Sequence, residues 1–309
     1  MTSTSTVRPT APDADVPATH SPAPPKRRGA LARFVRTQPL GAIAGVLITL
    51  MILAGIFAEQ VSPHDPMAMD YIAMLAAPSA EHPFGTDAFG RDVLSRVIHG
   101  ARTALLIGLL SSFLGSTAGA LIGAASAYFG GATDSIIQRL IDILLSFPII
   151  ILAMVIVAML GRNLWLGLDL NLIAAIALPI VPKVARVARS AALSIRQLPY
   201  IDAARTAGYS HARIIVRHMM PNIMAPYLIL LTAFIAQAIL LEASLSFLGL
   251  GVSEPTPAWG LMLSGNNADF YREAPWLVLF PGMAISLAVF AFSLLGDSLR
   301  DFLDPKFKA

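Results

Sequence analysis

The sequence predicts an all-α membrane protein with six transmembrane helices and with both termini in the cytoplasm. Its composition predicts the membrane class: 56% of the 309 residues are hydrophobic and only 13% are charged, whereas a soluble domain carries about 25% charged residues. The distribution of Lys and Arg predicts the orientation. The chain contains no Cys, which excludes a disulfide framework, a thiolate metal site and a Cys nucleophile in this chain.

Residues 1–36 are expected to form a disordered, basic cytoplasmic tail. The beginning of this segment is rich in Ser, Thr, Pro and Ala, which bury too little apolar surface to offset the entropy of ordering. An uncharged run follows, and a first transmembrane helix is expected over residues 39–61. A signal peptide has a shorter apolar core, of about 7 to 15 residues, so this run is interpreted as a retained span.

Residues 62–102 are expected to lie outside the cytoplasm. Prolines interrupt the first part of this segment, and apolar residues at helical spacing from Val93 to Ala101 end it. With Asp92 four residues before Arg96, this pattern predicts an amphipathic helix on the membrane surface. Three single histidines are interpreted as solvated or interfacial, with metal binding as the less favoured alternative: His64, His82 and His99.

Residues 103–296 are expected to form one domain with five further transmembrane helices, followed by a cytoplasmic tail over residues 297–309. Long apolar runs predict these helices. They cover residues 103–133, 136–160, 164–184, 221–241 and 276–295. The fourth run is the least regular, because Asp169, Pro179 and Pro182 interrupt it.

Small residues in the second span predict close helix packing. Gly115, Gly119 and Gly123 recur every four residues, which places three bare backbone patches on one face of a helix. Packing within this subunit is favoured over a dimer-specific role. In the third span, Arg139 and Asp142 are three residues apart and are expected to form a local ion pair.

The positive charges predict the orientation, because cytoplasmic segments next to spans carry an excess of Lys and Arg. If the amino terminus is cytoplasmic, six spans place most of the 22 Lys and Arg residues inside. The exceptions are Arg91, Arg96, Arg102, Arg162 and Arg272. Both termini are therefore expected in the cytoplasm, together with the loop between the fourth and fifth spans.

The chain lacks the motifs of several enzyme classes. It has no Gly-Lys-Ser or Gly-Lys-Thr phosphate-binding loop, no His-Glu-x-x-His zinc helix and no Gly-x-Ser-x-Gly elbow. We therefore predict no catalytic residue, no metal ligand and no ATP site in this chain. An intramembrane hydrolase using Ser111 or Ser112 is disfavoured, because no base is paired with either serine at helical spacing.

One carboxylate lies deep in a predicted span. Glu242 falls near the outer end of the fifth span, and Ser246 follows one turn later. A charged group inside a span costs about 2.5 to 3.5 kcal/mol. Glu242 is therefore interpreted either as lining the translocation pathway with Ser246 or as a hydrogen-bonded structural carboxylate. A proton-coupled carrier that uses Glu242 and Asp142 is an alternative from another functional class.

The loop between the fourth and fifth spans, residues 198–222, is long, basic and internally patterned. Pro199 suits the first turn of a short helix and Gly208 its end, while Ser210 can cap a second helix that Pro221 stops. The short helix has small side chains that can enter a groove on another protein. They are Ala203, Ala204 and Ala207, next to Asp202.

This loop resembles the EAA loop of permease subunits of bacterial ATP-binding-cassette (ABC) importers. That pattern is Glu-Ala-Ala, three residues, Gly, nine residues, Ile, one residue, Leu-Pro. The residues that match without a gap in the spacing are Asp202, Ala203, Ala204, Gly208 and Pro221. The chain departs from the pattern where Asp202 replaces Glu, and where His218 and Met220 stand at the Ile and Leu positions.

Further strings resemble the C-type permeases of dipeptide, oligopeptide and nickel importers. They are His82–Asp87, Gly90–Arg96, Ser246–Gly249, Pro255–Gly260, Gly296–Asp301 and Leu303–Pro305. The resemblance implies the type I ABC importer permease fold and a multi-pass location in the bacterial inner membrane. It also implies the import of di- or oligopeptides, with nickel or glutathione as alternative substrates.

The resemblance also implies the partners. A second, homologous permease subunit would complete the pathway, two cytoplasmic ABC ATPase subunits would bind ATP and Mg²⁺, and an extracytoplasmic binding protein would deliver the substrate. Residues 202–208 would form the helix seated in an ATPase groove. The chain itself is expected to hold no cofactor, and to contact membrane lipid but no nucleic acid.

Overall fold

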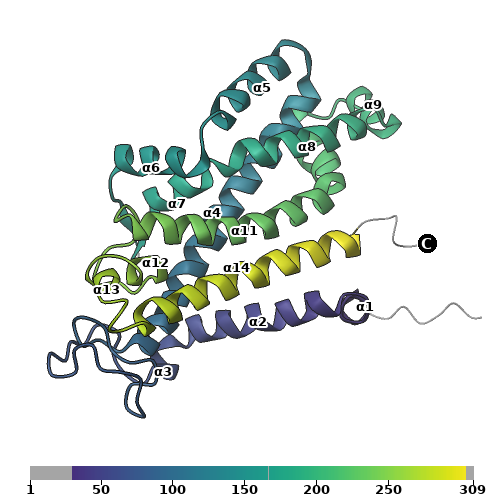
Figure 1. Ribbon diagram of the computed structural model, residues 1–309. Coiled ribbons are helices and arrows are strands. Elements are labelled where there is room, and N and C mark those ends of the chain that lie inside the picture. Colours follow the sequence, from purple (N-terminus) through teal and green to yellow (C-terminus); the bar gives the residue numbers. More distant parts are fainter. Residues whose placement is uncertain (1–29, 166, 304–309) are drawn as a thin grey trace, which may run out of the picture.

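The computed structural model describes residues 30–165 and 167–303, and its regular structure is almost entirely helical (Figure 1). Within these ranges the paired strands are the two-residue β1 (Leu164–Trp165) and β2 (Leu168–Asp169), which form a small antiparallel hairpin. The predicted all-α class is therefore confirmed. The predicted tail residues 1–29 and 304–309 lie outside the described part of the chain.

Four helices are long and apolar enough to cross a membrane on their own. They are α2 (Pro39–Ile56), α4 (Val93–Phe129), the run His211–Phe247, which ends with α11 (Met224–Phe247), and α14 (Trp276–Leu303). Two bent pairs pass the same test only when combined. They are α5 (Gly131–Leu145) with α6 (Ile149–Leu160), and α7 (Leu170–Ala177) with α8 (Ile180–Arg196). The described residues thus contain four candidate spans, or up to six if each bent pair is one span.

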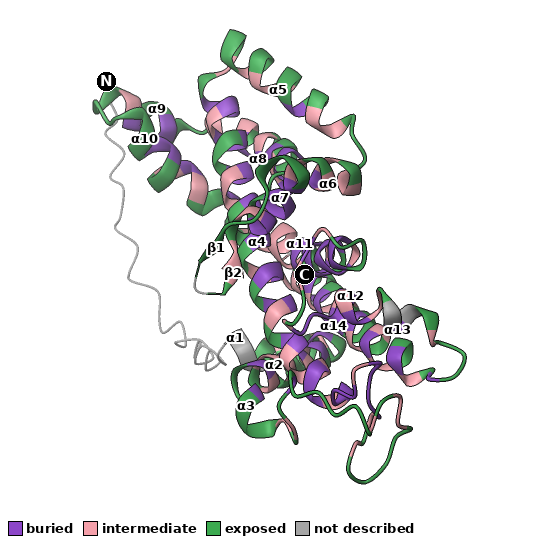
Figure 2. Ribbon diagram, turned by 90° about the vertical axis from the view of Figure 1, so that its left-hand side faces the viewer, coloured by how far each residue is buried: buried purple, intermediate pink, exposed green. Residues whose placement is uncertain are grey.

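The span predicted over residues 136–160 is not one continuous helix, because the chain bends by 94° between α5 and α6. Pro148 lacks an N–H and disfavours helical backbone at Phe147, so α5 ends before these residues and α6 begins after them. Most of α5 is exposed, and it projects from the other helices (Figure 2). The smaller bend between α7 and α8, of 43°, falls at Pro179, where the sequence predicts an interruption.

The amphipathic helix predicted before residue 103 is not a separate element, because α4 continues without interruption for 37 residues. Asp92 caps its first turn by accepting a hydrogen bond from the Ser95 N–H (2.8 Å), and no Pro follows within the helix to end it. Arg96, expected at the membrane surface, is fully buried. At about 55 Å in length, α4 exceeds a hydrocarbon core of about 30 Å.

Helical structure extends further at both ends than the predicted tails allow. The end of the predicted amino-terminal tail forms α1 (Ala30–Thr37), and α14 continues past Gly296 to Leu303. The Phe34 and Phe302 rings pack edge to face, with 5.4 Å between their centroids. This contact joins α1 to the end of α14.

Two groups of short elements lie at opposite ends of the molecule (Figures 1 and 2). At one end are α3 (Ala58–Val61), the loop of residues 62–92, which we call the cap loop, α12 (Trp259–Met262) and α13 (Asn266–Asp269). At the other end are α9 (Pro199–Thr206) and α10 (His211–Ile214). The long helix α4 connects the two ends.

The helices pack around α4, which crosses α2, α14 and α11 (Figure 1). α14 lies between α2 and α11, and the second half of α4 also contacts α8. One apolar cluster joins α4 to α7, α8 and α11, and a second joins α4 to α2, α11, α12 and α14. Both α4 and α11 therefore contribute residues to both clusters.

The glycine stripe of α4 faces the backbone of the α7–α8 segment in the same chain. A Cβ atom at Gly115 would lie 2.5 Å from the Ala177 carbonyl oxygen, and one at Gly119 would lie 2.6 Å from the Val181 carbonyl oxygen. A Cβ at Gly123 would likewise meet backbone atoms of α8. Only Gly allows the two helices to approach this closely, so the stripe packs within this subunit.

The variant Gly119→Ala is expected to destabilise the protein by about 1 to 3 kcal/mol. The added methyl group would lie 2.6 Å from the Val181 carbonyl oxygen and 2.8 Å from Val184 Cβ, so α4 and α8 must move apart. Thermal unfolding of the purified protein in detergent measures the effect. Gly45→Ala is the matched control, because a Cβ at Gly45 of α2 meets no atom within 4 Å. Equal losses in the two variants would contradict this account of the packing.

Candidate functional site

The patterned loop of residues 198–222 forms a short helix, a sharp turn and a capped second helix. α9 begins at Pro199, as the sequence predicts. Gly208 has a φ of +76°, in the left-handed region that favours Gly, and its N–H donates to the Arg205 carbonyl (3.0 Å). Ser210 caps α10 by accepting a hydrogen bond from the Arg213 N–H (3.4 Å). These local contacts turn the chain directly from α9 into α10.

The small residues of α9 divide between two faces of the helix. Ala204 (5% exposed) and Ile201 (0% exposed) are buried in the apolar cluster of this chain. Asp202, Ala203 and Ala207 are exposed, and we call these three residues the α9 surface. Ala204 was expected to belong to the same docking face, but here it packs inward, because residues three apart share one side of a helix and Ala204 follows the buried Ile201 by three.

Tyr128 at the end of α4 contacts both helices of the loop. The Arg205 guanidinium carbon lies 4.9 Å from the centre of the Tyr128 ring, and the Tyr128 hydroxyl forms a hydrogen bond with His211 Nδ1 (2.8 Å). Arg205 also pairs with Asp202 of the α9 surface (3.1 Å). A cation–π contact, a hydrogen bond and an ion pair therefore link the α9 surface to α4.

A second set of polar contacts ties this end of α4 to α5 and α8. Arg189 of α8 donates from Nε to Asp134 Oδ1 (2.6 Å), and the Ser126 hydroxyl donates to the same oxygen (2.5 Å). Arg196 donates to the Ala127 carbonyl (2.9 Å). These contacts were not predictable from the sequence, because the paired residues are far apart in the chain and share no local pattern.

The local ion pair predicted on α5 is wrong. Asp142 pairs with Arg186 of α8 instead of Arg139, because α5 and α8 lie against each other. The Asp142 side chain is 61% exposed and that of Arg186 is 55% exposed. An ion pair exposed to this extent contributes little to stability.

Pro221 does not stop the second helix of the loop, contrary to the prediction. The chain passes through a π-helical turn (Ile215–Met219) and a 3-10 turn (Met220–Ile223) and continues as α11. Changes of helical pitch accommodate the proline, which has no N–H to donate. Asn222 Nδ2 donates to the His218 carbonyl (2.7 Å). The loop is therefore joined to α11 by helical backbone.

Glu242 and Ser246 lie buried on α11. Both residues are 0% exposed, and the Ser246 hydroxyl donates to Glu242 Oε1 (2.7 Å). The Val252 N–H donates to the Ser246 oxygen (3.0 Å). The other carboxylate oxygen, Glu242 Oε2, is buried and has no hydrogen-bond partner, so Ser246 satisfies only one of the two oxygens.

At the opposite end of α4, two buried arginines join the cap loop to the loop before α12. Arg91 donates to Asp87 Oδ2 and to Glu254 Oε2, both at 2.7 Å. Arg96 Nε lies 3.8 Å from Asp87, and its Nη2 lies 3.5 Å from Glu254. Burial lowers the pKa of Arg91, but the hydrogen bonds and charges of Glu254 and Asp87 outweigh it and raise that pKa above its ordinary value. Two carboxylates thus balance two guanidinium groups.

Three of the motif strings meet at this network, namely His82–Asp87, Gly90–Arg96 and Pro255–Gly260. The Trp259 indole donates to the Val97 carbonyl (2.9 Å), and the Thr103 hydroxyl donates to the Pro257 carbonyl (2.9 Å). These bonds place the Pro255–Gly260 string against the first turns of α4. Glu254 was not predicted as a functional residue, because it stands beside that string but belongs to no recognised pattern.

The arrangement of long helices around α4 has a counterpart among solved structures. The MetNI methionine ABC transporter, in an inward-facing conformation, matches with a TM-score of 0.51 and 16% identity, over 68% of this chain and 98% of that chain. At this level of identity the likeness shows the fold alone. The chain therefore shares the fold of the matched chain of that transporter.

Residues 115–309 match the family model described as the binding-protein-dependent transport system inner membrane component, and residues 28–78 match the amino-terminal transmembrane domain of oligopeptide transport permease C. The chain belongs to this family of inner membrane transport components, which confirms the resemblance of its motifs. It is a multi-pass protein of the bacterial inner membrane.

Individual relatives agree with the family model. The chain is 42% identical to a putative peptide transport system permease protein of Brucella suis, over 85% of this chain and 86% of the relative. It is 41% identical to a dipeptide transport system permease protein of Alkalihalophilus pseudofirmus, over 89% of this chain and 88% of the relative. A glutathione transport system permease protein of Escherichia coli is 40% identical, over 89% of each chain.

The variant Asp87→Asn is expected to destabilise the protein by about 3 to 5 kcal/mol, because Arg91 and Arg96 would retain one charged partner, the half-exposed Glu254. The melting temperature in detergent measures the loss. Glu59→Gln is the matched control: Glu59 pairs with Arg102 at 3.8 Å between exposed side chains, and its loss should change little. An Asp87→Asn protein as stable as this control would refute the role of the network.

Proposed function

We propose that this chain is a permease subunit of an ATP-driven importer that moves di- and oligopeptides into the cytoplasm by alternating access. Family membership supports the transport role, and the peptide and dipeptide permeases among the relatives support the substrate class. In this proposal each bent helix pair counts as one span, which gives six spans. Both termini and the 198–222 loop then face the cytoplasm, and the cap loop faces outward.

The observation that carries the coupling role is the exposed α9 surface. Asp202, Ala203 and Ala207 present small side chains and one carboxylate, which suits a groove on a cytoplasmic ATPase. Two such ATPase subunits would bind ATP and Mg²⁺. A second homologous permease would complete the pathway, and an extracytoplasmic binding protein would deliver the peptide.

The contacts of Tyr128 give this surface a mechanical connection to the pathway. A force on α9 acts on α4 through Arg205 and His211, which both contact the Tyr128 ring or hydroxyl. Since α4 is continuous from Tyr128 to the cap loop, closure of the ATPases would move both ends of α4 together. Nucleotide-driven motion is thereby converted into alternating access.

The experiments below also distinguish other substrates and other classes of protein. A glutathione importer is the nearest alternative, because one relative at 40% identity is a glutathione permease, and a nickel importer is a further one. A proton-coupled carrier has less support, since Asp142, one of the two carboxylates it would use, is exposed in an ion pair with Arg186. A hydrolase also lacks support: Ser112 donates to the Leu231 carbonyl and Ser111 has no hydrogen-bond partner.

The variants Ala203→Arg and Gly208→Pro are expected to abolish uptake and substrate-stimulated ATP hydrolysis. Arg at residue 203 would fill the exposed face of α9, and Pro cannot adopt the φ of +76° at Gly208 or donate its N–H. Co-purification with the ATPases and transport in proteoliposomes measure the effect. Ala203 tests docking more directly than Ala204 does, because Ala203 is exposed, whereas Arg at residue 204 would disrupt the buried packing of α9 itself.

Ala68→Arg provides the control for these variants, because Ala68 is an exposed alanine in the cap loop at the opposite end of the molecule. It should insert and bind the ATPases as the parent protein does. Normal transport by Ala203→Arg and Gly208→Pro would overturn the coupling role.

Uptake by the assembled importer is expected to require ATP, to persist when a protonophore collapses the proton gradient, and to be inhibited by unlabelled peptides. Proteoliposomes with labelled dipeptide measure these three properties. Competition by glutathione or Ni²⁺ but not by peptides would replace the proposed substrate. Uptake that continues without the ATPases and stops with the protonophore would replace the transporter class.

A further inference from the structure

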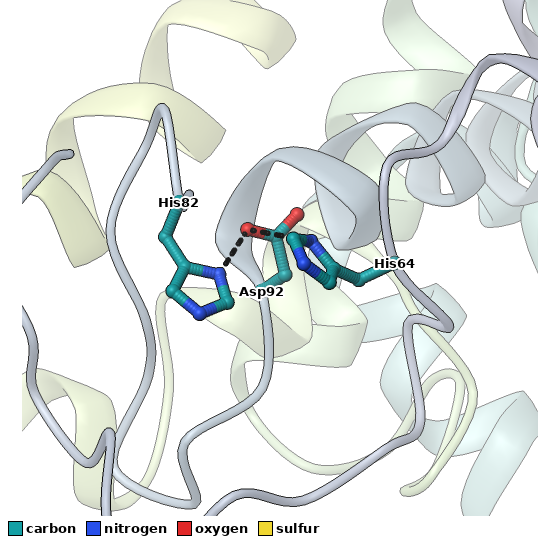
Figure 3. A group of neighbouring side chains, drawn as sticks. All are labelled: His64, His82 and Asp92. Carbon is teal, nitrogen blue, oxygen red and sulfur yellow. Dashed lines mark hydrogen bonds and ion pairs between the residues drawn. The ribbon is translucent and has the colours of Figure 1, made fainter. Parts of the chain in front are cut away.

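Three side chains with metal-binding atoms converge at the beginning of α4 (Figure 3). His82 Nδ1 lies 2.9 Å from Asp92 Oδ1, and His64 Nδ1 lies 3.8 Å from the same oxygen. The ligand atoms of all three residues lie within 4.8 Å of one another. The sequence favoured solvated or interfacial histidines over metal ligands here, because His64 and His82 stand 18 positions apart in the cap loop.

Hydrogen bonding among these residues leaves one buried ring nitrogen without a partner. His82 satisfies Asp92 Oδ1 with a single hydrogen bond, whereas His64 Nδ1 is buried and has no hydrogen-bond partner. The Ser62 hydroxyl, two residues earlier, is also buried and unpaired. Buried polar atoms are nearly always paired in proteins, and each unpaired one costs about 1 to 3 kcal/mol. A cation between the three side chains would satisfy His64 Nδ1 and His82 Nδ1 together.

The carboxylate is held with one oxygen directed at the two rings. Asp92 Oδ2 accepts hydrogen bonds from the Ser95 N–H (2.8 Å) and the Ser95 hydroxyl (2.7 Å). The Ser95 hydroxyl oxygen in turn accepts a hydrogen bond from the His64 backbone N–H (3.1 Å). Ser95 thus fixes both Asp92 and the backbone of His64, which is the outer-shell support that orients metal ligands.

His82 is fixed by a turn of its own. Its carbonyl accepts hydrogen bonds from the N–H groups of Ser79 and Gly85, both at 2.9 Å, and its N–H donates to the Ser79 hydroxyl (3.1 Å). The His82 side chain is 14% exposed, that of Asp92 is 1% exposed and that of His64 is 36% exposed. The cluster is therefore rigid on two sides and open to solvent at His64.

We propose that His64, His82 and Asp92 bind a divalent transition-metal cation, with Zn²⁺ as the best fit. Two imidazole nitrogens and one carboxylate oxygen form a ligand set typical of Zn²⁺, and water entering beside His64 would supply the fourth position. Zinc bonds of about 2.1 Å place tetrahedral ligands about 3.4 Å apart. The observed separations of 2.9 and 3.8 Å from Asp92 bracket this value.

The ion would fasten the cap loop to α4. Its ligands come from the start of the loop, from its middle and from the residue that caps α4, so one ion closes two loops of chain at once. The site is independent of the transported substrate and of the coupling role of α9. If the chain binds no metal, the proposed transport function is unaffected. If the transport function is wrong, the proposed metal site is unaffected.

The test uses the full-length chain, purified in detergent and stripped of metal with a chelator. Isothermal titration with Zn²⁺ should give one site per chain, Co²⁺ should give the visible absorption of a four-coordinate ion, and Zn²⁺ should raise the melting temperature. His64→Ala and His82→Ala should each weaken Zn²⁺ binding by about 10- to 100-fold. Asp92→Asn should weaken it similarly, while its amide oxygen can still cap α4.

His99→Ala is the matched control. His99 lies on α4, is partly buried like His64 and His82, and is outside the cluster. It should bind Zn²⁺ as the parent chain does. The absence of a site in the parent chain, or equal affinity in His64→Ala and the parent, would overturn the proposal.

A second measurement needs no variant and so does not depend on folding of the mutants. Zn²⁺ should protect His64 and His82 of the parent chain from modification by diethyl pyrocarbonate, as mapped by mass spectrometry, and should leave His99 unprotected. Equal modification of His64 and His82 with and without Zn²⁺ would also overturn the proposal.

Discussion

The close approach of α4 to α8 is the constraint on which the rest of the structure depends. Lipid surrounds helices with an apolar medium, so helices associate in a membrane through close van der Waals contact rather than through expulsion of water. Gly115, Gly119 and Gly123 remove the side chains that would separate the two backbones. This contact covers the second half of α4, from Gly115 to Ala127, and the unbroken helix carries the position of that half to the cap end. Asp92 and the cap loop occupy one end, and Tyr128 with α9 occupies the other.

Buried charge has the corresponding role at the cap end. Arg96 points from α4 into the protein interior and is 0% exposed, a position that requires compensating charge. Its two acidic neighbours, Asp87 and Glu254, come from segments more than 160 residues apart. The cap loop and the loop before α12 must therefore dock together for either to be electrostatically balanced. Such a network contributes more to the choice of one arrangement than to net stability.

The sequence predicted those features that local rules determine. Long apolar runs identify α2, α4, α11 and α14. Pro199, Gly208 and Ser210 mark where α9 begins, where the chain turns and where α10 is capped. The same rules failed where distant contacts decide the outcome. Pro221 marks a point that cannot hold a regular hydrogen bond, but only the neighbouring turns and Asn222 show that the helix continues through it.

Residue pairing across helices was not predictable for the same reason. Asp142 has a basic residue three positions away, yet the structure pairs it with Arg186 of another helix. Ala203 and Ala204 are equivalent in the sequence pattern, and only the packing of Ile201 decides that Ala204 is buried while Ala203 is exposed. His64 and His82 are isolated in the sequence, whereas folding of the cap loop brings both to Asp92. In each case the missing information is the orientation of one element relative to another.

The positions of the bends show how such a chain can move in the proposed assembly. The path from the α9 surface through Tyr128 to the cap loop follows α4, which has no Pro and no break within its 37 residues. The irregular points lie beside this path, at Pro148 between α5 and α6 and at the π-helical turn before α11. The glycine stripe holds α8 against α4 along the same path. In the proposed alternating access, α4 and α8 would therefore move as one unit, and the backbone angles would change at the bends beside them.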